Sequence, residues 1–170
     1  MHGYRKKNTV ILLFDHFEAD LLSHSIKRLI QNYKLRPERL PARVAKAWYS
    51  TRGCESAAMS EDETKEWLRG LNEIKKSNLR FLNRCVKNLS SKKAATPTLR
   101  LRIDLAAKLM IALNDHRLLL AAQHNVGEAE MSLSAFVLTK QLTSRQMAAI
   151  AQIDFLAWVV EEILAAIQRP

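Results

Sequence analysis

Residues 97–126 of this 170-residue chain read PTLRLRIDLAAKLMIALNDHRLLLAAQHNV, a stretch that stays apolar on nearly every side. Thr96 and Pro97 are typical of a helix start, with an N-cap followed by proline at the first helical position. Gly127 is typical of a helix end. A helix that is apolar all round is normally buried. The sequence therefore predicts a helix over 97–125 that lies at the centre of the fold.

Apolar residues recur at three- and four-residue spacing on both sides of this stretch, which predicts further amphipathic helices. Capping signals support two starts, Asp15 for one helix and Ser60 with Glu63 for another. The expected long helices cover 16–34, 61–89 and 144–168, and a short one begins at Pro41 and ends before Gly53. A second short helix over 132–140 stays open, because segment 128–142 has no clear pattern.

The predicted elements favour a single all-α domain over residues 1–170. Residues 10–14 have the composition of a strand, but no second strand is identified to pair with them, so residues 1–14 are interpreted as an extended lead-in. Helices joined by short connectors predict an up-and-down bundle. We expect four long helices and one or two short ones around a shared core.

Composition and charge bound the class of protein. The chain has 27 Lys and Arg against 17 Asp and Glu, a net charge of +10, which favours acidic or polyanionic partners. The apolar run at 10–14 is shorter than a signal peptide requires, and charged residues interrupt the run at 147–167. Cys54 and Cys85 lack a metal or redox spacing. We expect a cytoplasmic protein with reduced thiols and no membrane segment.

One charged residue falls inside an apolar face of the central helix. At 100° per residue, Arg117 lies in the middle of the predicted buried side, where an uncompensated charge would cost several kcal/mol. The candidate carboxylate partners are Glu18, Asp154 and Glu161. A structural ion pair is the favoured interpretation. The alternatives are an anion or acidic-peptide site lined by Arg117 and Asn114, or an arginine that reaches solvent along its own stem.

The sequence resembles an uncharacterised bacterial family, domain of unknown function two thousand and seventeen (DUF2017). Three blocks carry the resemblance: FDHFEADLL at 14–22, LAAKLMIALNDHRLLLAAQHNV at 105–126 and FLAWVVEEILAAI at 155–167. The most specific segment is ALNDHRL, residues 112–118. Some members are labelled regulators, a label that does not amount to an activity. The resemblance draws attention to four positions: Glu18, Asn114, Asp115 and Arg117. Together with the candidate partners Asp154 and Glu161, these residues define a predicted buried polar cluster.

Basic residues recur along the predicted helix 61–89. The spacing of four, four and three predicts one cationic stripe, which the following connector extends: Lys76, Arg80, Arg84, Lys87, Lys92 and Lys93. Such a stripe can neutralise phosphates of a nucleic acid in a salt-sensitive way. The favoured interpretation is a solvated cationic surface, because no aromatic residues alternate with the cations as single-strand binding requires.

No motif in the sequence predicts an enzyme. Nucleotide-binding glycine motifs, HExxH, GxSxG and ExxH are absent, so no catalytic, cofactor-binding or metal-binding residue is expected. We therefore expect a non-enzymatic protein-interaction or regulatory module with a protein partner, with self-association open. The alternative is a nucleic-acid-binding regulator that uses the basic stripe. Catalysis would require a concave pocket around Arg117.

Overall fold

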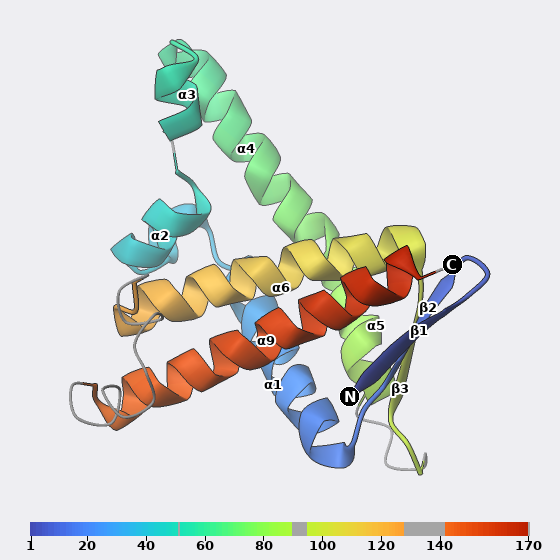
Figure 1. The fold of residues 1–170 in the computed structure, drawn as a ribbon. Helices are drawn as coiled ribbons and strands as arrows, with labels where there is room; N and C mark the ends of the chain where they lie inside the picture. Colours follow the sequence, from blue (N-terminus) through green and yellow to red (C-terminus); the bar gives the residue numbers. More distant parts are fainter. Residues whose placement is uncertain (51, 90–94, 128–141, 170) are drawn as a thin grey trace.

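The computed structural model describes residues 1–50, 52–89, 95–127 and 142–169. The chain combines helices with a three-stranded antiparallel sheet, so the prediction of an all-α bundle is wrong (Figure 1). The strands are β1 (His2–Lys6), β2 (Thr9–Leu13) and β3 (Thr98–Arg102), in the order β1-β2-β3. Gly3, Leu12 and Leu99 stand opposite one another in the register.

Two predicted segments were misassigned, and both belong to the sheet. The extended lead-in is a hairpin, because the polar segment His2–Lys6 pairs with Thr9–Leu13 as an edge strand. The first residues of the predicted helix 97–125 form β3 instead. There, buried Leu99 and Leu101 alternate with exposed Arg100 and Arg102, which is the two-residue period of a half-buried strand.

Of the three long helices, two pack on the sheet and on each other, and the third packs against one of these two. In Figure 1, α6 (Ile103–His124) and α9 (Ser144–Gln168) run side by side, and α1 (His16–Tyr33) crosses them. The N-cap predicted at Asp15 is confirmed, and the structure adds that Glu18 completes a capping box with it. The end of α6 comes before Gly127, because Asn125 adopts a left-handed conformation at φ 53°.

The predicted helix 61–89 is two helices that meet at Asn78. The first is α4 (Glu61–Ser77), which begins with the expected capping box, and the second is α5 (Leu79–Leu89). The short connecting elements are η1 (Pro37–Arg39), α2 (Ala42–Trp48) and α3 (Arg52–Ser56). Figure 1 shows α3 and α4 standing clear of the other helices. We call these two helices the arm and the rest of the described chain the body.

The body has one connected apolar core, to which the inner face of the sheet and helices α1, α2, α5, α6 and α9 contribute. No helix within the described residues is long and apolar enough to cross a membrane. The short helix considered over 132–140 lies outside the described residues.

Candidate binding surface

Asp115 is the hydrogen-bonding centre where four helices meet. Its Oδ2 accepts hydrogen bonds from the Tyr33 hydroxyl at 2.5 Å and from the Lys75 ammonium at 2.6 Å. Its backbone carbonyl accepts a hydrogen bond of 2.8 Å from the indole N–H of Trp48. These partners come from α1, α4 and α2, while Asp115 itself lies on α6. The contacts fasten the base of the arm to the body.

The Lys75 ammonium, which forms an ion pair with Asp115, is also surrounded by aromatic rings. It lies 4.9 Å from the ring centroid of Trp48, 5.6 Å from that of Tyr33 and 5.9 Å from that of Tyr49, all within cation–π range. Burial, followed by the charge of Asp115, raises the pKa of both tyrosines. Both hydroxyls therefore stay protonated and able to donate. We call these five residues the Asp115 junction.

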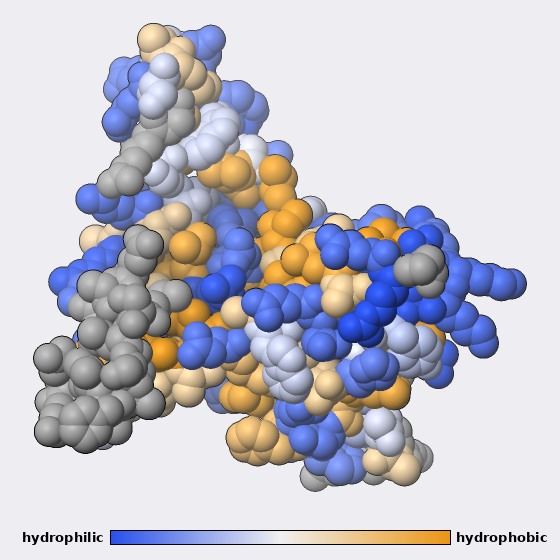
Figure 2. Space-filling view, in the orientation of Figure 1, coloured by the Kyte–Doolittle hydropathy of each residue, from blue (hydrophilic) through white to orange (hydrophobic). Residues whose placement is uncertain are grey.

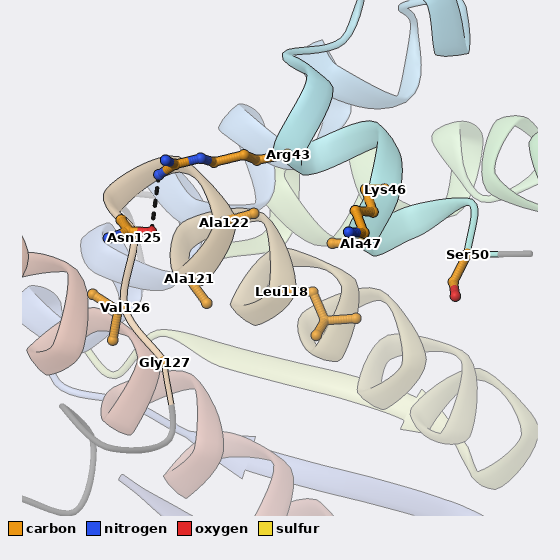
Figure 3. A pocket seen from close by; sticks show the side chains of 10 residues that line it. All are labelled: Arg43, Lys46, Ala47, Ser50, Leu118, Ala121, Ala122, Asn125, Val126 and Gly127. Atoms are coloured by element: carbon orange, nitrogen blue, oxygen red, sulfur yellow. Dashed lines mark hydrogen bonds between the residues drawn. The ribbon is translucent and has the colours of Figure 1, made fainter. Parts of the chain in front are cut away.

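Beside the junction, α2 and α6 enclose a pocket of about 480 Å³ (Figure 3). Its floor is the exposed side of α6, where Leu118 keeps 46% of its surface in solvent. Arg43 and Lys46 of α2 stand on its rim. Arg43 donates a 2.9 Å hydrogen bond to Asn125 Oδ1 at the carboxyl end of α6, where a cation suits the helix dipole.

A smaller pocket of about 160 Å³ lies on the α9 side of the same helix and includes Ile153. Arg117 donates a 3.0 Å hydrogen bond to Asn114 Oδ1, while its buried Nε has no partner among the described residues. Leu118 and Ala121 line both pockets, so the two hollows share one ridge of α6. We call this surface the α6 groove. None of the described residues that line it is acidic.

The structure keeps Asn114 and Arg117 of the predicted buried polar cluster in contact and separates them from the predicted carboxylate partners. Asp154 and Glu161 are exposed on α9, so neither provides a buried partner for Arg117. Glu18 binds the amino group of Met1 at 2.5 Å and caps α1. The predicted helical face was displaced by one residue, since His116 is fully buried while Arg117 is only half-buried.

Glu162, which the sequence did not single out, does make a long-range contact. It is half-buried and accepts a 2.9 Å hydrogen bond from the backbone N–H of Gly3. This contact ties α9 to the edge strand of the sheet.

Only part of the predicted basic stripe can be located. Lys76 of α4 and Arg80, Arg84 and Lys87 of α5 are all exposed, and no ion pair within the described ranges involves them. Lys92 and Lys93 lie outside the described residues. The stripe is available to solvent, and no aromatic ring pairs with it in the part of the chain that the structure describes.

Sequence reasoning missed two features of the junction and its surroundings. Lys75 was overlooked because its neighbour Lys76 fits the stripe, although a lysine on the apolar side of a helix is itself a signal. His116 is fully buried, and neither ring nitrogen has a hydrogen-bond partner within the described chain. Burial, with help from the charges of Arg28 and His24, lowers the pKa of His116 to about 3. The imidazole is therefore neutral at pH 7.

The described residues hold no cluster of three or more side chains suited to a metal ion. Cys54 and Cys85 are buried free thiols, and burial raises the pKa of Cys85 to about 12. The shift at Cys85 is opposite to the lowered pKa of a reactive cysteine.

Comparison with known proteins gives a family and nothing finer. The chain matches none of the curated proteins and none of the solved structures with which it was compared. A family model described as Domain of unknown function (DUF2017) matches residues 73–167. The matched region contains Lys75, Asp115 and Arg117, while the β1–β2 hairpin and α1 lie outside it. Because the match spans more than half of the chain, the protein belongs to the DUF2017 family.

Proposed function

We propose that the protein is a non-enzymatic interaction module that docks an acidic amphipathic helix of a partner protein in the α6 groove. The main support is the exposed apolar ridge at Leu118, which lies between two hollows. The residues lining these hollows include cations and no acidic residue. A regulatory role follows if occupancy of the groove controls what that partner does.

The apolar part of the surface has the dimensions of a helix-binding face. Ile111 is 60% exposed and precedes Leu118 by seven residues, so both side chains lie on one side of α6, about 10 Å apart along its axis. A partner helix can place side chains of its own apolar stripe against such a face. Figure 2 shows apolar side chains gathered where the arm approaches α6.

The charged side chains around the α6 groove determine which charge a partner segment must carry. Arg43 and Lys46 stand on one side of the ridge and Arg117 on the other. The buried Nε of Arg117 would gain a hydrogen-bond acceptor from a carboxylate placed in the smaller hollow. A net charge of +10 favours the approach of an acidic segment from a distance. An acidic helix therefore complements the groove, and a basic one is repelled.

A designed peptide tests this proposal. The probe is a helix of about 20 residues with leucines on one stripe and glutamates beside them, and its charge-reversed twin carries lysines. Calorimetric titration should show that the glutamate peptide binds and that the lysine peptide does not. Leu118→Glu should abolish it, while Leu164→Glu, which alters an exposed leucine of α9 outside the groove, should leave it intact. Equal binding of both peptides, or no effect of Leu118→Glu, would overturn the proposal.

Self-association stays a separate prediction, tested by sedimentation velocity across a concentration series. Nucleic-acid binding through the stripe is the second candidate, and the exposure of Lys76, Arg80, Arg84 and Lys87 supports it. Electrostatic contact of that kind is independent of sequence. The stripe lacks the aromatic groups that a specific single-strand site would add.

A further inference from the structure

The sheet turns one face to the core, and most side chains of its other face are exposed or half-buried. Val10, Leu12 and Leu99 on the inner face are fully buried within the core. A Cβ at Gly3 would lie 2.9 Å from the backbone oxygen of Glu162, so α9 crosses this face at close range. Residues at alternate positions of each strand therefore point away from the core.

The outer face is cationic. The register places Tyr4, Ile11 and Arg100 in one row across the three strands, and Lys6, Thr9 and Arg102 in the next. The complete face is formed by His2, Tyr4, Lys6, Thr9, Ile11, Leu13, Thr98, Arg100 and Arg102. No acidic residue belongs to it, and all three of its Lys and Arg side chains are exposed. Figure 2 shows hydrophilic side chains dominating the surface around the β1–β2 turn.

Aromatic and apolar groups lie among these cations. The Tyr4 side chain is 36% exposed, and the His2 ring stacks beside it at a centroid distance of 6.2 Å. Ile11 is only 1% exposed although it lies outside the body's core cluster, so it forms an apolar base between Tyr4 and Arg100. An aromatic ring on a sheet with cations beside it is the arrangement that binds unpaired bases by stacking.

We propose that this outer sheet face binds a short single-stranded nucleic acid. A base stacks on Tyr4, and Lys6 and Arg100 contact the adjoining phosphates. Arg102 contributes less, since its guanidinium already pairs with Asp104 at 3.0 Å. The face is about 10 Å wide, two strand spacings, which suits two or three bases. A duplex fits poorly, because its bases are stacked on one another and cannot reach the tyrosine ring.

The basic stripe provides an internal comparison. It lies partly on α5, which packs beside β3, and its Arg84 and Lys87 are exposed, as Arg100 is. It has similar charge but no aromatic ring. If charge alone captured the strand, stripe and sheet substitutions would weaken binding to the same extent.

Fluorescence anisotropy with the full chain tests the proposal. The probes are a labelled single-stranded oligouridine of about 12 nucleotides and a duplex DNA of equal length, each at about 50 and 200 mM salt. Tyr4→Leu keeps an apolar side chain beside Ile11 but removes the ring, and should weaken single-strand binding about tenfold. Tyr4→Phe should retain it. Arg100→Glu should weaken binding at least tenfold, and Arg84→Glu should have a smaller effect.

Thermal melts establish that each variant is folded before its binding is compared. Tighter binding of the single strand than of the duplex, with loss in Tyr4→Leu and recovery in Tyr4→Phe, is the expected result. Three results would overturn the proposal: no single-strand binding at low salt, tighter binding of the duplex, or a Tyr4→Leu variant that binds as well as the native chain.

Discussion

The helices α5 and α4 arise from one continuous amphipathic pattern, yet they differ in how they are held. α5 buries its apolar side chains, including Leu82, which is fully buried in the body. α4 buries only Lys75 and leaves Trp67 and Ile74 exposed. An amphipathic pattern therefore predicts a helix without predicting that its apolar stripe is covered. The body is held by apolar burial, and the arm by the Asp115 junction.

The largest effect should come from the body. Leu82→Ala removes a fully buried side chain from α5 and leaves a cavity, which should lower the free energy of unfolding by about 2–5 kcal/mol. Urea denaturation followed by circular dichroism measures this change. A loss below about 1 kcal/mol would show that α5 is not part of the packed core.

The next effect should come from the junction. Asp115→Ala leaves the Lys75 ammonium, whose side chain is 9% exposed, without its ion-pair partner, and should cost about 2–4 kcal/mol. Replacing Lys75 by methionine in the same variant removes the unpaired charge and should recover part of the loss. If the double variant is as unstable as the sum of the single ones, the two residues act independently.

Acid should loosen the body through His116. Because burial lowers its pKa to about 3, the unfolded chain binds a proton near pH 6.5 that the folded chain does not. The stabilisation is present above pH 6.5 and is lost as the pH falls towards 3, by about 1.4 kcal/mol per pH unit.

The His116→Leu variant is the control for this prediction. Its unfolding free energy should vary less between pH 7 and pH 5, and it should be no less stable at pH 7, because the unpartnered imidazole is gone. Denaturation midpoints of the native protein and of His116→Leu, measured at three pH values, test this difference in pH dependence. Parallel pH profiles for the two proteins would show that His116 is not the responsible group.

The smallest effect should be found on the arm. Ile74 is 58% exposed, so Ile74→Ala should change the free energy of unfolding by less than about 0.5 kcal/mol. The same denaturation experiment serves here, with Leu82→Ala as the matched apolar truncation. A cost close to that of Leu82→Ala would mean that the arm packs against a surface in solution.

Most helices could be predicted because periodic spacing and capping residues act locally. Asp15, Ser60 and Thr143 each cap a helix as a local rule requires. The sheet was missed for two reasons. The pairing of residues 9–13 with 98–102 is a long-range property, and the polar segment 2–6, although it pairs locally with 9–13 in a hairpin, carries a weak strand signal. The TLRLR alternation at 98–102 was the available signal.

The candidate sites depended on tertiary contacts in the same way. Asp115 and Arg117 were singled out, but their partners could not be assigned from helical spacing. Successive residues of a helix are rotated by 100°, so an error of one position in the predicted buried face assigns the wrong residue to the core. Here His116 is buried where Arg117 was expected. The outer sheet face exists only once the hairpin of residues 2–13 is placed in register with the distant segment 98–102.

Amide hydrogen exchange tests the contrast between arm and body most directly. Amides of residues 64–71 in α4 should exchange through local opening, at free energies well below global stability, while those of 82–89 in α5 should exchange only on global unfolding. Asp115→Asn should accelerate exchange in α4 more than in α5. Equal protection of the two helices in the native protein would contradict the account.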